Sequence, residues 1–180
     1  MQQYYVWDPL VRLFHWSLVI LFFLNALVID PDASLHETLG YVALGLVVLR
    51  LVWGLLGTRY ARFASFPPSP SGAVEQLTEI ATGRTNAQKG HSPLGALMIY
   101  NLLLSLIGIG LSGYLMTTDM FWSTEWPEEL HEALVIWAEI SVVLHVGAVI
   151  FESRRTRINL ARAMITGYKE MPTPDTEPRS

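Results

Sequence analysis

Four long apolar runs dominate the pattern of hydrophobic and polar positions along the chain. They cover residues 10–29, 39–56, 94–116 and 130–151, and turn-forming or charged residues bound each of them. A helix needs about 20 mostly apolar residues to cross the roughly 30 Å of hydrocarbon in a membrane. The pattern therefore predicts an all-α membrane protein, a bundle of four transmembrane helices.

The first run has a competing interpretation as a cleaved signal peptide. Such a peptide begins with basic residues and has a short apolar stretch. Here the first eleven residues contain no Lys or Arg, and the apolar run is longer than a signal peptide needs. We therefore expect the run to remain in the protein as the first spanning helix.

The segment between the second and third runs, residues 60–92, differs from the rest in composition. It opens with a proline-rich stretch at 66–70, and Ser71 then precedes apolar residues spaced as on one helix face, namely Ala73, Val74, Leu77, Ile80 and Ala81. This spacing predicts a short helix on the membrane surface, capped by Ser71. We expect a single domain over residues 1–171 and a disordered tail at 172–180, which is rich in Pro, Thr and Glu.

Basic residues predict the direction of insertion, because Lys and Arg near spanning helices stay on the cytoplasmic side. The connections 30–38 and 117–129 contain seven acidic residues and no Lys or Arg. Outside the spans, the Lys and Arg residues lie in the connection 57–92 and after residue 151, all on the side of the two termini. We therefore expect both termini in the cytoplasm and the acidic connections on the outer side.

The amino-acid composition excludes several kinds of partner and cofactor. The chain of 180 residues is 51% hydrophobic and 16% charged, with a net charge of −4. This composition excludes a nucleic-acid partner, which requires a basic surface. The absence of cysteine excludes disulfides, iron–sulfur clusters and covalently attached haem, and it leaves histidine as the main soft metal ligand.

Four of the five histidines lie at matched depths in the expected bundle. His131 and His145 are 14 residues apart, which places them about 40° apart around one helix and about 21 Å apart along it. Antiparallel helices then pair His15 with His145 on the cytoplasmic side and His36 with His131 on the outer side. Taken singly, His36 and His131 are also compatible with ordinary interfacial residues, whereas His15 and His145 are costlier to bury, which favours a role for them.

Two facing imidazoles can fill both axial positions of a haem iron. The two pairs therefore predict two b-type haems stacked across the membrane. Gly40, one turn after His36, would leave room for a porphyrin beside that histidine.

Several motifs resemble the bacterial cytochrome b561 and nickel–iron hydrogenase cytochrome b superfamily. They are VWDPLVRLFHW (6–16), HETLGY (36–41), RLVWG (50–54), GHSPLG (90–95) and His131-Glu132. The resemblance implies an electron carrier with two haems in a bacterial inner membrane, which exchanges electrons with quinone and a redox partner. It also implies that His15, His36, His131 and His145 are the axial ligands. Related formate dehydrogenase subunits imply a quinone site beside the cytoplasmic-side haem.

Three further residues are candidates for contacts to the haem on the cytoplasmic side. Arg50 and Arg12 could each pair with a propionate and raise the potential of that haem, and the alternative for Arg50 is an arginine that reaches the headgroups. His91 could hydrogen-bond a propionate or carry protons for a quinone, or it could be an ordinary loop residue.

Glu139 lies about midway through the fourth run, where a charge is costly. We expect a protonated carboxyl bonded to Asn101 or Ser141, with a proton relay as the alternative.

The acidic outer connections predict a basic partner, such as a periplasmic c-type cytochrome, and a homodimer stays open. Two other functions also stay open. One is an oxidase that passes electrons from superoxide to quinone, although acidic outer connections would repel that anion. The other is a divalent-metal transporter that uses His36, Glu37, His131 and Glu132.

Overall fold

The computed structural model describes residues 2–84, 88–121 and 123–171, so the expected tail at 172–180 lies outside the described residues. Within them the chain forms an all-helical bundle with one small sheet. The long helices are α1 (Pro9–Leu27), α2 (Ser34–Leu56), α4 (Pro93–Met116) and α5 (Trp126–Thr156). The shorter elements are β1 (Gln2–Tyr5), the 3-10 turn η1 (Phe63–Ser65), α3 (Pro70–Ala81), the 3-10 turn η2 (Asp119–Phe121), α6 (Leu160–Thr166) and β2 (Tyr168–Met171).

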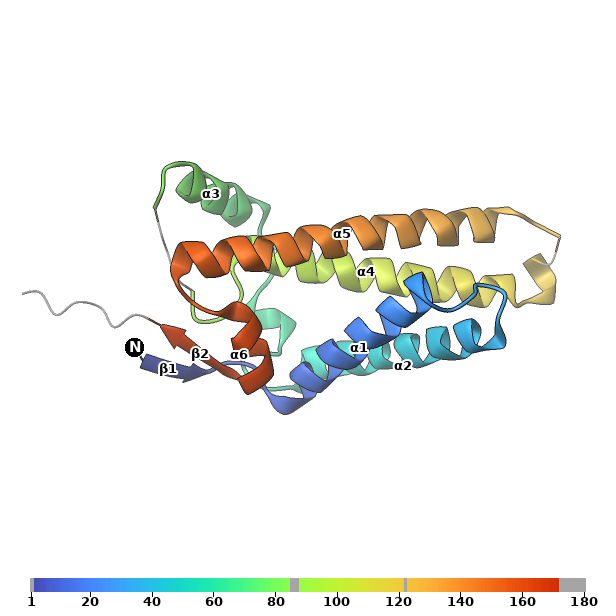
Figure 1. Ribbon diagram of the computed structural model, residues 1–180, viewed down its shortest axis with the longest axis horizontal. Helices are drawn as coiled ribbons and strands as arrows, with labels where there is room; N and C mark the ends of the chain where they lie inside the picture. Colours follow the sequence, from blue (N-terminus) through green and yellow to red (C-terminus); the bar gives the residue numbers. More distant parts are fainter. Residues whose placement is uncertain (1, 85–87, 122, 172–180) are drawn as a thin grey trace, which may run out of the picture.

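The four long helices run lengthwise through the molecule, and each is long and apolar enough to cross a membrane (Figure 1). α1 packs on α2, α2 on α4, and α4 on α5. The short elements α3, α6, β1 and β2 gather at the end of the bundle where the N-terminus lies. The four-helix bundle expected from the hydrophobic pattern is therefore confirmed.

Two long helices extend beyond the runs that predicted them. α2 starts at Ser34 rather than at 39, and α5 covers Trp126–Thr156 rather than 130–151. Hydrophobicity marks only the part of a helix that lies in lipid, whereas 31 residues of helix measure about 46 Å. As a result His36 and His131 lie inside helices and not at their entrances.

Three helices begin with the same local signal, a capping side chain followed by proline. Asp8 accepts from the backbone N–H of Val11, Ser69 from that of Gly72, and Ser92 from that of Gly95. Proline suits the first helical position because its missing N–H would have no intrahelical partner there. The cap of α3 is therefore Ser69, and the expectation of Ser71 is wrong.

Asp8 also joins the start of α1 to the end of α2. Its carboxylate accepts from Thr58 Oγ1 at 2.5 Å and from Trp53 Nε1 at 3.2 Å. Burial favours a raised pKa for Asp8, but the hydrogen bonds from Thr58, Val11 and Trp53 outweigh it and hold the pKa below its ordinary value. Asp8 is therefore a buried carboxylate that ties the start of α1, two turns before His15, to the end of α2.

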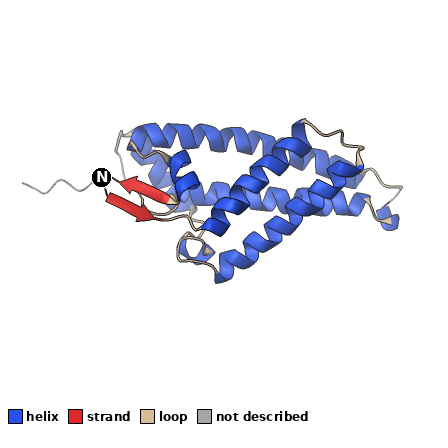
Figure 2. Ribbon diagram, turned by 60° about the horizontal axis from the view of Figure 1, so that its bottom comes forward, coloured by secondary structure: helices blue, strands red, loops and turns tan. Residues whose placement is uncertain are grey.

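The sheet is a ribbon of two strands that the sequence did not predict. β1 pairs antiparallel with β2, from Gln2 opposite Met171 to Tyr5 opposite Tyr168 (Figure 2). The backbone N–H groups of Val6 and Trp7 then donate to the carbonyl of Gly167. The ribbon ties the first residues of the chain to the segment after α6, beside the same end of the bundle.

Candidate functional site

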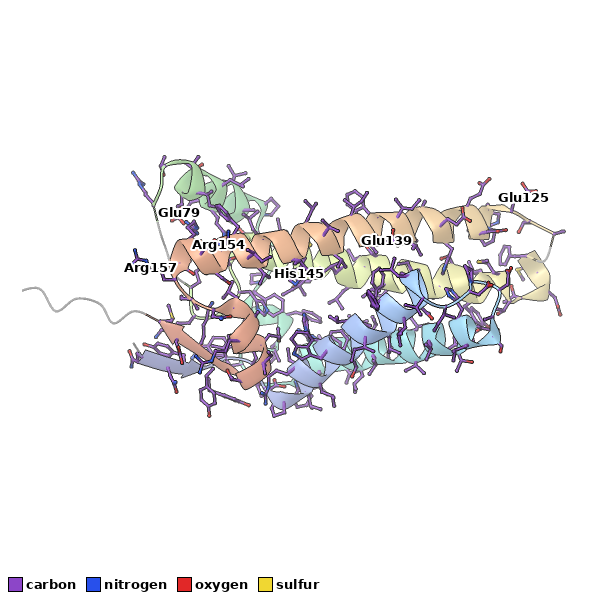
Figure 3. The ribbon with its side chains drawn as sticks, viewed as in Figure 1. Glu79, Glu125, Glu139, His145, Arg154 and Arg157 are labelled. Atoms are coloured by element: carbon purple, nitrogen blue, oxygen red, sulfur yellow. The ribbon has the colours of Figure 1, made fainter. Side chains whose placement is uncertain are left out.

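The structure brings the four paired histidines together as two facing pairs. The rings of His15 on α1 and His145 on α5 have centres 6.5 Å apart and planes inclined at 58°. The rings of His36 on α2 and His131 on α5 have centres 6.3 Å apart and planes inclined at 65°. Figure 3 shows His145 on the side of α5 that faces α1.

Helical periodicity explains why these rings point inward. On α2, His36, Gly40, Val47 and Arg50 recur at spacings of three, four and seven residues, and Val47 and Arg50 are buried. On α5, Ala138 and Ser141 lie between the two histidines at the same spacings and are buried as well. Residues at these spacings share one helix face. His36, His131 and His145 therefore lie on the inner faces of their helices.

The separation of the rings fits one metal ion between each pair. An imidazole nitrogen binds a metal at about 2.0 Å and lies roughly 1.1 Å from its ring centre, so two axial imidazoles have centres about 6.2 Å apart. Among the described hydrogen bonds, none involves an Nε2 atom of the four rings. These nitrogens are therefore the ones available to an iron.

The surroundings of His131 set its tautomer. Its Nδ1 lies 3.0 Å from the carbonyl oxygen of Ile109 and 3.2 Å from Ser112 Oγ. Because a carbonyl can only accept, Nδ1 must carry the proton, and Nε2 keeps its lone pair for a metal. A Cβ atom at Gly113 would lie 3.3 Å from His131 Cε1, so glycine there lets the ring approach α4.

The sequence interpretation did not find this support from α4. Neither Ser112 nor Gly113 was a candidate from the sequence. The available signal was that Ser105 and Ser112 are seven residues apart and therefore share a face.

His15 and His36 differ from His131 in the surroundings of Nδ1. The Nδ1 atom of each is buried with no hydrogen-bond partner in the described part of the chain. No contact at Nδ1 therefore fixes the tautomer of these two rings, and the case for them as ligands rests on the facing geometry of the two pairs.

Gly40 lies one turn after His36 and has no tight neighbour. A Cβ atom there would meet nothing closer than Asn25 Nδ2 at 3.8 Å. The same amide donates to the carbonyl oxygen of His36 at 3.1 Å. Asn25 on α1 therefore holds the turn of α2 that carries the His36 ring.

Arg50 is a buried cation with one unused donor. Its side chain is 5% exposed, Nη2 donates to the carbonyl oxygen of Ala61, and the guanidinium lies 4.9 Å from the centre of the Phe63 ring. Nη1 is buried and has no partner among the described residues. The Phe63 ring fits against α2 only because residue 54 is glycine, since a Cβ there would clash with it. This arrangement suits a carboxylate ligand.

Arg12 has a contact that the sequence did not indicate. Its Nη1 donates to the carbonyl oxygen of Ile165 at 2.6 Å, which joins α1 to α6. Its Nε is buried without a partner in the described structure. Arg12 thus has a structural role and keeps one donor on the inner side.

The His91 ring packs, tilted, between two aromatic rings at the end of the bundle. Its ring centre lies 4.5 Å from that of Trp7 and 4.2 Å from that of Phe66. Burial, together with the positive charges of Arg50 and Lys169, lowers the pKa of His91 to about 3. An imidazole with this pKa holds no proton at neutral pH, which disfavours the proton-carrier interpretation.

Glu139 does not form the expected hydrogen bond to Asn101 or Ser141. Instead Asn101 Nδ2 donates to Ser141 Oγ at 2.8 Å, and Trp137 Nε1 donates to Asn101 Oδ1 at 2.9 Å. Glu139 is half-buried on α5, about 80° around the helix from His131. Asn101 therefore joins Ser141 to Trp137, and Glu139 is not part of this chain of hydrogen bonds.

The metal-transporter alternative finds no site in the described residues. They contain no group of three or more His, Asp or Glu side chains placed to hold a metal ion. Two imidazoles at each position suit a metal whose other ligands come from a macrocycle, as in haem.

A comparison with protein families finds a match over most of the chain. The model of the family described as prokaryotic cytochrome b561 matches residues 6–167. No curated protein and no solved structure shows a match to the chain.

Proposed function

Because this chain belongs to the prokaryotic cytochrome b561 family, we propose that it carries electrons across a bacterial inner membrane through two b-type haems. Membership makes it a multi-pass b-type cytochrome for electron transfer; the number and position of the haems are the proposal. The observation that carries it is the presence of two imidazole pairs at 6.5 and 6.3 Å, each at the spacing that one iron requires.

His15 and His145 would hold one iron near the end with the termini, and His36 and His131 would hold the other about 21 Å away along α5. A haem at each position supplies reversible one-electron chemistry at its iron. Arg50 offers its unused Nη1 to a propionate of the first haem, and Arg12 adds a second positive charge near it. Positive charges favour the electron-rich state, so the His15–His145 site should have the higher potential.

The exchange partners follow from the two ends of the molecule. Basic residues outside the spans lie at the end with the termini, which favours the cytoplasm for that end. We assign quinone to this side, where the His15–His145 site lies closest. At the other end the acidic connections favour a basic periplasmic partner, such as a c-type cytochrome, and transfer to it should slow as salt rises.

Single substitutions test the assignment of ligands to pairs. His15→Ala and His145→Ala should each remove the same haem, while His36→Ala and His131→Ala should each remove the other. Loss of one axial ligand and its packing leaves the second pair intact, since the pairs share no residue. The haem content should therefore fall from two to about one per chain. The haem that remains should have the same reduction potential in His15→Ala as in His145→Ala, and the same potential in His36→Ala as in His131→Ala.

His91→Phe is the matched control, because it keeps an aromatic ring between Trp7 and Phe66 and should leave both haems bound. The assignment is wrong if His15→Ala and His145→Ala leave haems with different potentials. It is also wrong if any of the four variants keeps both haems.

A further inference from the structure

A groove runs along the surface between α4 and α5, in the half of the bundle nearer the chain termini. It has a volume of about 320 Å³, within the range of small-molecule sites. Its walls are mostly apolar, with Leu97, Ile140 and Leu144 among them, and it begins at Leu94 next to the cytoplasmic end of α4. Both helices are spanning helices, so the groove opens toward lipid. We refer to it as the α4–α5 groove.

Three polar side chains form a chain of hydrogen bonds inside this groove. The indole of Trp137 can only donate, and its Nε1 meets Asn101 Oδ1 at 2.9 Å. This contact fixes the orientation of the Asn101 amide and turns Nδ2 toward Ser141 Oγ at 2.8 Å. Ser141 is only 2% exposed, so the chain ends in a deeply buried hydroxyl.

The chain ends with donors to spare. Ser141 accepts from Asn101, so its own O–H is free to donate. The hydroxyls of Ser105 and Ser112 donate to the carbonyl oxygen four residues earlier, but no such bond of Ser141 occurs in the described residues. The amide of Asn101 has a second N–H as well. Two donors at the base of an apolar groove would be costly unless an acceptor meets them.

The groove is close to the inner imidazole pair. Ser141 precedes His145 by four residues, which is about 6 Å along α5 and about 40° around it. A molecule that reaches Ser141 therefore lies one helical turn from a residue that we assign as an axial ligand. Along α5, the groove thus lies about one helical turn from the His15–His145 site.

We propose that the α4–α5 groove binds the ring of a lipid-soluble quinone, with Asn101 Nδ2 and the Ser141 hydroxyl donating to one carbonyl oxygen of that ring. This inference rests on the proposed function and places its quinone. A quinone combines an apolar body with carbonyl acceptors, and so matches both the walls and the donors. A lipid acyl chain matches only the walls.

The reaction at this position is balanced by the known course of quinone reduction. A haem held by His15 and His145 would supply one-electron transfer beside the groove. Two electrons from the periplasmic partner and two protons from water at the cytoplasmic end of the groove would then reduce the quinone to quinol. The two ring C=O groups become C–OH groups, and the donor proteins are oxidised by one electron for each electron delivered.

Polar substitutions test the hydrogen bonds. The probe is a benzoquinone that carries one isoprenoid unit, and its dissociation constant is measured by equilibrium dialysis on the haem-loaded protein in detergent. Asn101→Leu and Ser141→Ala should each weaken binding about three- to tenfold, the effect of one lost hydrogen bond. Both variants should keep the visible spectrum of the wild type, because neither residue is assigned as a ligand.

A second pair of variants tests the groove by volume. Ile140→Trp fills the groove. Val146→Trp is the control, because it adds the same ring about 170° around α5 from the centre of the groove. The two residues are almost equally exposed, Val146 at 50% and Ile140 at 51%. Ile140→Trp should abolish binding of the probe and Val146→Trp should not.

The outcomes separate the two levels of the proposal. Wild-type protein that binds the probe while all four variants bind it equally well overturns the groove and leaves the proposed function standing. Wild-type protein that neither binds the probe nor passes electrons to it overturns the quinone arm of the proposed function. Loss of copurified phospholipid from Ile140→Trp, with unchanged probe binding, assigns the groove to an acyl chain and overturns the inference.

Discussion

The five imidazoles of the chain occupy two kinds of surroundings. Four of them face another imidazole across the bundle, and the contacts of His131 show how such a ring is prepared for a metal, with Nδ1 held by the carbonyl of Ile109. His91 faces no imidazole and is held between Trp7 and Phe66 near two cations. The same residue type is therefore set up as a ligand in four positions and as a neutral packed ring in one.

The buried ring of His91 should make stability depend on pH. The folded chain protonates His91 only near pH 3, whereas the unfolded chain does so near its ordinary 6.5. Between these values the unfolded state binds more protons, so stability falls as pH drops below 6.5, by at most about 1.4 kcal/mol per pH unit. The melting temperature of wild-type protein should decrease more between pH 7 and pH 5 than that of His91→Phe. Equal decreases would show that His91 does not titrate this way.

At the scale of elements, the ribbon of β1 and β2 and the helix α6 join the two ends of the chain. Gly167, between α6 and β2, has φ +88° and its carbonyl accepts from both Val6 and Trp7. A Cβ atom there would lie 2.8 Å from the carbonyl oxygen of Trp7. Glycine is required at this position both for its backbone angle and for the close approach of the N-terminal segment.

Gly167→Ala should therefore lower the free energy of unfolding by more than the backbone angle alone costs. Gly83 is the matched control, because it also has positive φ, +72°, but a Cβ there meets no atom within 4 Å. Gly83→Ala should cost about 1 kcal/mol, and Gly167→Ala clearly more, up to about 3 kcal/mol. Thermal unfolding in detergent measures both, and equal losses would argue against a tight contact between Gly167 and the N-terminal segment.

The elements differ in how well the sequence predicts them. The four spanning helices were predictable because lipid imposes a long apolar run on each. The pairing of the histidines followed from helical rise and antiparallel order. The β1–β2 ribbon was not predictable, since it pairs four residues near one end of the chain with four near the other, and no local signal marks such a contact. The contact between Arg12 and Ile165 was not predictable for the same reason, because the two residues are 153 positions apart.

Contacts between helices also determine which hydrogen-bond partners the polar residues inside the bundle have. The sequence shows that Asn101, Ser141 and Glu139 lie at similar depths, but depth alone does not say which side chains meet. The partners depend on which face of its helix each side chain occupies. Asn101 shares a face-to-face contact with Ser141 and Trp137 rather than with Glu139. The cap of α3 was also mispredicted, and here the cause is local. Pro70 suits the first helical position, so the residue before it, Ser69, is the cap rather than Ser71.

At the scale of the whole molecule, charge is divided between the two ends of the bundle. Figure 3 shows Glu125 at one end and Arg154 and Arg157 at the other. Of the connections between spanning helices, the two at the Glu125 end contain no Lys or Arg. The division predicts one orientation in the membrane, with the termini in the cytoplasm.

Single cysteines can test this orientation on a clean background, because the chain contains none. Met120 in η2 is 81% exposed at the acidic end, and Ser71 at the start of α3 is exposed at the other end. A membrane-impermeant maleimide should label Met120→Cys in intact spheroplasts and Ser71→Cys only after lysis. Labelling of Ser71→Cys alone in intact spheroplasts would reverse the orientation, and with it the side assigned to quinone.

The central claim is that two imidazole pairs hold two haems in one chain. The most direct measurement is the amount of haem b per polypeptide in the purified protein, determined by the pyridine haemochrome spectrum against quantitative amino-acid analysis. Two haems per chain, both low-spin as two axial imidazoles require, is the predicted result. One haem per chain, or none, in protein produced with ample haem would contradict it.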